Sequence, residues 1–294
     1  MEPDVDITEG VQAAEGWLHR GVTADGAVRF LAVEARALAD RVRQHHELGP
    51  DAARLAGEAL VSALLMSAWI KGEERVTLQV QGEAPRLAFI CDVDANGGTR
   101  ARLTPRHLRS ADGRVRGLVY AIKSTPRAEL YRGVTALEDQ TMEEGLVSHL
   151  TGSDQVDALL RLDARVDEDG SLAFAGGIML ERLPWSDEQR SLDSEAFALM
   201  FQGLKSQSVD DLLTALAFGT IGSQPASLLE SRALHWRCSC SQQRIEAVLA
   251  QLDAHELSEM ARVDGQAEVT CNFCNIAWTV SAPRLLELAA ARPA

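Results

Sequence analysis

The stretches RCSCSQQRIEAVLAQL (residues 237–252) and EVTCNFCN (residues 268–275) hold four of the five cysteines of the chain. The first carries a Cys-x-Cys pair and the second a Cys-x-x-Cys pair, with thirty residues between the pairs. Four thiolates fill the tetrahedral coordination of Zn²⁺, and two such pairs within one small domain are typical of a structural zinc site. The sequence therefore predicts one zinc ion with four ligands, which are Cys238, Cys240, Cys271 and Cys274.

The predicted ligand set also limits the chemistry of the site. A catalytic zinc ion keeps one coordination position open, and four thiolates leave none. Nearby His235 is therefore interpreted as a surface histidine and not as a ligand. On an extended strand the thiols of Cys238 and Cys240 would point to opposite faces, so we expect a turn at the Cys-x-Cys pair.

Composition excludes several classes of protein. The 294 residues carry a net charge of -14, which disfavours binding to nucleic acid or to an anionic membrane surface. The longest apolar run, residues 55–70, is interrupted by Glu58 and is too short to span a bilayer. The acidic start MEPDVDITEG has no pattern of a secretory signal. We expect a cytoplasmic protein whose cysteines are not permanent disulfides.

Residues 1–183 alternate between strand and helix patterns. We predict a mixed α+β domain with largely antiparallel sheets. Strands are expected at residues 28–35, 75–81, 86–93, 114–123, 159–166 and 171–180, and helices at residues 37–46 and 51–70. Asp51 is the predicted N-cap of the second helix, after Gly49-Pro50.

Residues 184–231 contain helix formers interrupted by Gly, Ser and Pro, and we predict a metastable helical linker. Its apolar residues fall on helical faces. They are Leu192, Ala196, Leu199 and Met200, then Val209, Leu212, Leu213 and Leu216, with Phe197, Phe201 and Phe218 nearby. Core packing is one interpretation of these residues, and a surface that opens to hold other proteins is the other.

Residues 232–294 form the predicted small zinc-binding domain. Ser241 is expected to cap a helix over residues 242–252, and Asp253 with Glu256 has the spacing of a capping box. Two short strands joined by the CNFC segment are expected at residues 268–270 and 276–280.

Other chemical motifs fail. Cys91 lies in a predicted strand and is interpreted as buried and inert. Asp92, Asp94, Asn96 and Gly97 begin like a calcium loop, but Leu103 stands where the bidentate Glu is needed, so a turn is expected. His45-His46 is interpreted as a solvated helix end. The chain contains no phosphate-binding glycine loop and no serine nucleophile elbow, so no enzyme is predicted.

The cysteine segment, residues 237–275, resembles the 33-kDa redox-regulated chaperone family of bacteria. Supporting similarity comes from RVTLQVQGEAP (75–85), DVDANG (92–97), YRG (131–133), SDQ (153–155) and AGGIMLERLP (175–184). Two positions depart from the family pattern. Asn275 stands where Gly often follows the Cys-x-x-Cys pair, and Glu181 stands where Gln is expected.

The resemblance implies an ATP-independent holdase that binds unfolding proteins under oxidative and heat stress. In this reading the reduced, zinc-bound protein is inactive. Oxidation pairs Cys238 with Cys240 and Cys271 with Cys274, zinc is released, the linker unfolds, and the active form dimerises. A structural zinc contributes roughly 10–16 kcal/mol, whereas disulfides that close loops of three or four residues contribute about 2 kcal/mol or less each. Oxidation is therefore expected to unfold the segment.

Two other functions stay open. The first is a structural zinc-ribbon interaction module without redox switching, although residues 232–294 carry six Arg and seven acidic residues and so lack a basic surface for nucleic acid. The second is an enzyme in the N-terminal domain with zinc as scaffold, for which no cluster of acid, base and nucleophile is found.

Overall fold

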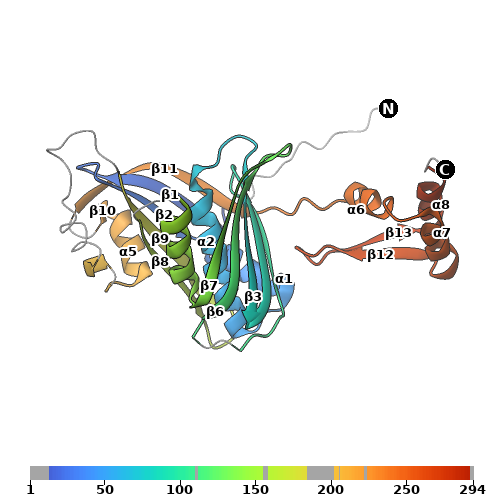
Figure 1. The fold of residues 1–294 in the computed structure, drawn as a ribbon, viewed down its shortest axis with the longest axis horizontal. Helices are drawn as coiled ribbons and strands as arrows, with labels where there is room; N and C mark the ends of the chain where they lie inside the picture. The colour runs from blue at the N-terminus through green and yellow to red at the C-terminus, as the bar shows by residue number, and fades with distance from the viewer. Residues whose placement is uncertain are drawn as a thin grey trace. The chain divides into compact units, whose positions relative to one another are not determined.

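The computed structural model describes residues 13–109, 112–154, 158–183, 202–204, 206–221 and 224–291. The chain divides into two compact units, Met1–Trp236 and Arg237–Ala294 (Figure 1). The parts of the expected linker that are described, from residue 202 to residue 231, belong to the first unit. The expected helical residues Leu192, Ala196, Phe197, Leu199, Met200 and Phe201 lie outside the described residues.

The first unit is built on one sheet in the order β7-β6-β3-β4-β5-β11-β1-β2-β9-β8, with β10 paired to β11. Its strands are β1 (Gly16–Thr23), β2 (Val28–Glu34), β3 (Arg75–Ala84), β4 (Arg86–Asp94), β5 (Gly98–Thr104), β6 (Val115–Ser124), β7 (Glu129–Gln140), β8 (Ala158–Val166), β9 (Leu172–Arg182), β10 (Thr220–Ile221) and β11 (Gln224–Trp236). All neighbours are antiparallel except β5 and β11. The predicted α+β class with largely antiparallel strands is confirmed.

Helices pack against this sheet. They are α1 (Arg36–His46), α2 (Pro50–Met66), the 3-10 turn η1 (Ser67–Trp69), α3 (Met142–His149), the π turn η2 (Leu150–Asp154) and α5 (Val209–Ala217). Helix α2 has 12 of its 17 residues buried and contacts strands from both halves of the sheet, so it forms the centre of the core (Figure 1).

The predicted N-cap of α2 was wrong by two residues. Gly49 is the N-cap, and Pro50 occupies the first turn. Proline suits that position because its missing N–H would have no partner there and its φ angle is already helical. Asp51 instead lies in the first turn, where its negative charge interacts favourably with the helix dipole.

Glu181, the departure from the expected Gln, lies in β9 and is 3% exposed. Its carboxylate forms an ion pair with Arg29 on the neighbouring strand β2. The guanidinium of Arg29 in turn lies 3.7 Å from the centre of the Trp69 ring. A buried carboxylate is tolerated at this position because a charged partner is provided on the adjacent strand.

Strand β11 (Gln224–Trp236) contradicts the prediction of a helical linker over residues 184–231. It pairs with β1 over eight residues, from Gly16↔Leu234 to Thr23↔Ala226, and it also meets β5 at His235 and Trp236. Its sequence QPASLLESRALHW is rich in residues with high helix propensity. Pairing with a distant strand overrides that local preference.

Helix α5 confirms the helical prediction for its own segment. The Ser208 hydroxyl caps it by accepting a hydrogen bond from the Asp211 N–H at 3.0 Å. Val209 and Leu212 are buried. Leu212 joins a core cluster formed with residues of β2, β8, β9 and β10, so α5 is packed on the sheet by its apolar face.

The second unit contains α6 (Gln242–Leu249), α7 (Ala254–Val263), the antiparallel pair β12 (Gln266–Thr270) and β13 (Ala277–Ser281), and α8 (Ala282–Ala290). The predicted caps at Ser241 and Asp253 are confirmed, the latter as a capping box with Glu256. Helix α8 was not predicted. No helix within the described ranges has the length and apolar character needed to cross a membrane.

Gly97, in the turn between β4 and β5, lies close against the backbone of β11, and this close packing can be tested. Gly97 has φ +85°, and a Cβ atom there would overlap the carbonyl oxygen of Ala233 in β11. Gly72 has a similar φ of +62° but no atom within 4 Å of such a Cβ. We expect Gly97→Ala to lower the free energy of unfolding by at least about 1 kcal/mol more than Gly72→Ala, because only the first adds an overlap. Urea unfolding followed by circular dichroism measures the free energy of unfolding of both variants. Equal decreases in the two variants would contradict the close packing of Gly97 against β11.

Candidate metal centre

Four thiols converge in the second unit. The sulfur atoms of Cys238, Cys240, Cys271 and Cys274 all lie within 4.8 Å of one another. Sγ–Sγ distances are 3.5 Å for Cys238–Cys240, 3.6 Å for Cys238–Cys271 and 3.4 Å for Cys240–Cys274. Ligands about 2.3 Å from a tetrahedral zinc ion stand about 3.8 Å apart, so this cluster has the dimensions of a four-thiolate zinc site.

The Cys-x-Cys pair is shaped by the segment that leads into α6. Residues 237–241 are in no strand, and α6 begins directly after them with the Ser241 hydroxyl accepting from the Arg244 N–H at 3.3 Å. The Arg244 guanidinium reaches back and donates to the Ser239 carbonyl oxygen at 2.9 Å. This bent segment brings the two thiols to the same side, and the turn expected at the Cys-x-Cys pair is present.

The Cys-x-x-Cys pair lies in the turn between β12 and β13. The Cys271 N–H donates to the Ile276 carbonyl at 3.0 Å, and the Asn275 N–H donates to the Cys271 carbonyl at 2.9 Å. Asn275 closes the turn with φ +54°, the left-handed conformation that glycine and asparagine adopt most readily. The replacement of the usual Gly by Asn therefore keeps the turn that aims the two sulfurs.

The thiols of Cys271, Cys240 and Cys274 differ in how readily they lose a proton. Burial opposes ionisation of Cys271, but hydrogen bonds from the N–H groups of Cys274 and Phe273 and from the Cys238 thiol outweigh it and lower its pKa to about 7. Burial raises the pKa of Cys274 and of Cys240. A metal must displace the thiol protons, and Cys271 gives up its proton more readily than Cys240 or Cys274.

The candidate ligand set of the cluster consists of cysteines alone. The groups of three or more metal-binding side chains found in the described parts of the chain consist of these four cysteines, and no histidine or carboxylate joins them. His235 is half buried in β11 of the first unit, where its N–H donates to the Gly97 carbonyl at 3.1 Å. The arrangement suits a structural metal ion and leaves no ligand position for a reacting water.

Arg244 was missed as a supporting residue, and so was Arg284. Arg284 of α8 forms an ion pair with Glu246 of α6 at 2.8 Å. The role of Arg244 could have been predicted from the sequence. It lies three residues after the Ser241 cap, and helix geometry places a residue there beside the segment that precedes the helix. The Arg284 contact depends on α8, a helix that was not predicted.

The fifth cysteine is separate from the metal centre. Cys91 lies in β4 and is 0% exposed, and burial raises its thiol pKa well above the usual value. The interpretation of Cys91 as buried and unreactive agrees with this environment.

The rejected calcium loop is a turn. The Asp94 carboxylate accepts from the N–H groups of Asn96 and Gly98, at 2.9 Å and 3.0 Å. The Asp92 carboxylate forms an ion pair with Arg100 at 2.6 Å.

The interpretation of His45-His46 as a solvated helix end was wrong for His46. Its side chain is 7% exposed and is hydrogen-bonded through Nε2 to the Ala101 carbonyl at 3.2 Å.

The fold and the cluster define a class, an α+β protein with a small second unit that carries a four-cysteine cluster able to hold a metal ion. A family model described as Hsp33 protein matches residues 17–281, and the chain belongs to the Hsp33 family. It is 30% identical to the 33 kDa chaperonin of Symbiobacterium thermophilum over 92% of this chain and 96% of the relative. With the 33 kDa chaperonin of Geobacter sulfurreducens it shares 33% identity over 88% and 89%.

A solved structure has the same fold. It is the crystal structure of the 33 kDa chaperonin (heat shock protein 33 homolog) from Thermotoga maritima, with a TM-score of 0.81 and 22% sequence identity. The match covers 94% of this chain and 98% of that chain.

The cysteine environments generate a labelling prediction. In the native reduced protein treated with a zinc chelator, we expect maleimide to modify the four cluster thiols and to leave Cys91 unmodified. Raising the pH from 7 to 9 should speed the reaction of the cluster thiols, because the thiolate is the reacting form, and should not bring Cys91 into reaction. Mass spectrometry counts the labels. Denaturant should add one label to the wild type and none to Cys91→Ser, and native labelling of Cys91 would contradict its burial.

Proposed function

We propose that this protein is a redox-regulated, ATP-independent holdase that protects unfolding proteins from aggregation under oxidative and heat stress. In the proposal it is a cytoplasmic protein that is inactive when reduced and zinc-bound. Disulfide formation and zinc release activate it, and the active form is a homodimer without catalytic activity. The convergence of four cysteine sulfurs within 4.8 Å carries the proposal, and membership of the Hsp33 family supports it.

The size of the second unit explains why zinc would act as a switch. The unit spans Arg237–Ala294, close to the 60-residue size at which a domain buries only about 60% of its chain surface. Its buried core is formed by Ile245, Leu249, Leu257, Ala261, Ala267, Val280 and Leu285. Such a small core leaves folding dependent on a metal that contributes roughly 10–16 kcal/mol.

The proposed disulfides do not replace this contribution. Pairing Cys238 with Cys240 and Cys271 with Cys274 closes loops of three and four residues, which stabilise by about 2 kcal/mol or less each. Oxidation consumes the four thiolates that would hold the metal, and the unit then loses more stabilisation than it gains. Unfolding of the second unit on oxidation follows from this difference.

The path from the second unit to client binding starts at β11. A single residue, Arg237, separates the end of β11 from Cys238. Upstream of it, Phe218, Leu228 and Leu229 are 83%, 58% and 68% exposed. In the proposal, residues 184–231 are metastable, and their release after zinc loss uncovers further apolar surface that binds clients of matching apolar character.

The first test follows zinc and activity together. We expect peroxide at raised temperature to release one zinc ion per chain and, at the same time, to make the protein suppress aggregation of a denatured test protein. Reductant with added zinc should reverse both. A zinc-binding dye and light scattering measure the two signals. Zinc that stays bound, or zinc loss without holding activity, would instead favour a structural interaction module.

The second test concerns the ligands and the disulfide pairing. Cys238→Ser and Cys271→Ser should each weaken zinc binding by more than about 100-fold. Changing a residue that only supports a metal ligand costs up to about 100-fold in affinity, and loss of a ligand itself should cost more. Cys91→Ser is the matched control and should bind one zinc ion as the wild type does. Competition with a chelating dye measures the affinity.

The disulfide pairing is tested by peptide mapping of the oxidised wild type. We expect to find the disulfides Cys238–Cys240 and Cys271–Cys274. Finding Cys238–Cys271 together with Cys240–Cys274 would overturn the proposed pairing.

A further inference from the structure

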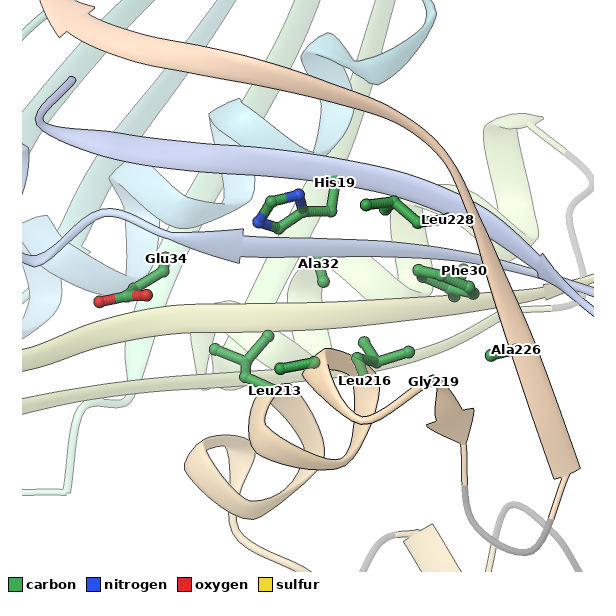
Figure 2. A pocket seen from close by; sticks show the side chains of 10 residues that line it. His19, Phe30, Ala32, Glu34, Leu213, Leu216, Gly219, Ala226 and Leu228 are labelled. Carbon is green, nitrogen blue, oxygen red and sulfur yellow. The ribbon is translucent and has the colours of Figure 1, made fainter.

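A cavity of about 380 Å³ lies in the first unit between α5 and β11, over strands β1 and β2 (Figure 2). Its floor is formed by Phe30 and Ala32, which are 2% and 1% exposed. Leu213 and Leu216 of α5 line one side, and Leu228 of β11 lines the other. The cavity is therefore mainly apolar, and its size is within the roughly 300–1,000 Å³ range of small-molecule sites.

The two ends of the cavity differ. Figure 2 shows Glu34 at one end and Phe30, Leu228 and Ala226 toward the other. His19, which also lines the cavity, is hydrogen-bonded through Nδ1 to the Ser231 hydroxyl at 2.8 Å. The side chain of Glu34 is exposed at its end of the cavity.

The charge at the polar end is negative. Burial lowers the pKa of His19, although the Glu34 carboxylate opposes this effect, and this disfavours a positive charge on the imidazole. Glu34 is then the charged side chain that lines the cavity, on a protein whose net charge is -14. A carboxylate beside an apolar wall selects a cationic head group over an anionic one.

We propose that this cavity is a binding site for small molecules that join an apolar, ring-bearing body to an ammonium group. The apolar body lies on Phe30 between α5 and β11, and the ammonium group lies beside Glu34. A cavity of about 150 Å³ holds one benzene ring, so 380 Å³ accommodates a body of two fused rings. The ligand class is thus an arylalkyl-ammonium compound.

Such a ligand would also restrain the segment that the proposed function requires to open, and this part rests on that proposed function. The cavity exists only while both α5 and β11 are packed over β1 and β2, because its walls come from all four elements. A ligand that binds this arrangement and not the opened one stabilises it by mass action. Bound ligand therefore slows activation.

The test uses the full-length, reduced, zinc-loaded protein and two probes with the same rings. These are 2-(1-naphthyl)ethylammonium and 1-naphthylacetate, titrated by calorimetry. We expect one ammonium probe to bind per chain, more tightly than the carboxylate probe. Glu34→Gln should weaken binding of the ammonium probe by about two- to fivefold, as for a partly exposed ion pair. Equal affinity of the two probes for the wild type, or no binding, would overturn the proposal.

Filling the cavity gives the matched comparison. Ala217→Trp places a bulky side chain at the lining of the cavity and should lower the affinity more than tenfold. Thr214→Trp, an exposed position on the same helix that does not line it, should not. Ala226→Phe is a second filling variant from β11, and circular dichroism with zinc content verifies that each variant is folded. Unchanged binding in a folded filling variant would overturn the site.

Activation measurements separate this proposal from the proposed function. Saturating ammonium probe should delay the appearance of aggregation suppression after peroxide in the wild type and not in Ala217→Trp. Binding without any delay would overturn the restraint. If the oxidised protein never suppresses aggregation, the proposed function fails, while the titrations still decide the site. Analytical ultracentrifugation could instead show that the reduced protein is a dimer that the probe dissociates. That result would assign the cavity to contact with a second copy of the chain and would overturn the proposal.

Discussion

The pairing of β11 with β1 connects the parts of the first unit that matter for function. Without it, the sheet has one half that ends at β5 and another that ends at β1, and the link to β5 covers only His235 and Trp236. The ladder also places Ala226 and Leu228 over the cavity beside α5. Because β11 ends two residues before Cys238, the same strand connects the sheet covalently to the metal centre.

The two units differ in how they are stabilised. The first has a large apolar core centred on α2, whose side chains are buried along nearly the whole helix. The second has a small core and a cluster of four thiols with the dimensions of a zinc site. A chemical change at the sulfurs therefore acts first on the second unit and leaves the core around α2 in place. This separation lets one part of a chain unfold while another keeps its structure.

Much of the fold was predictable wherever the signal is local. The strands at Val28–Glu34 and Arg86–Asp94, and the caps at Ser241 and Asp253, follow from alternation and from side-chain hydrogen bonding within one turn. Failures occurred where the decisive contact is distant. Strand β1 contains Gly16 and Gly21 and carries little alternation, and its neighbours β2 and β11 determine its conformation. His46 looked like an exposed helix end, and the Ala101 carbonyl of β5 buries and binds it.

The sequence by itself determined the candidate metal ligands and the family, because thiol chemistry belongs to single residues and the spacing of two short motifs is read directly from the chain. Asn275 could also be judged in advance, since its backbone conformation is a local property. Only the tertiary structure decided that residues 224–236 form a strand and that α5 and β11 enclose a cavity over β1 and β2. The physical reason is that Leu228 pairs with Gly21 about two hundred residues away, and the free energy of such a contact is not encoded in the local preference of either segment.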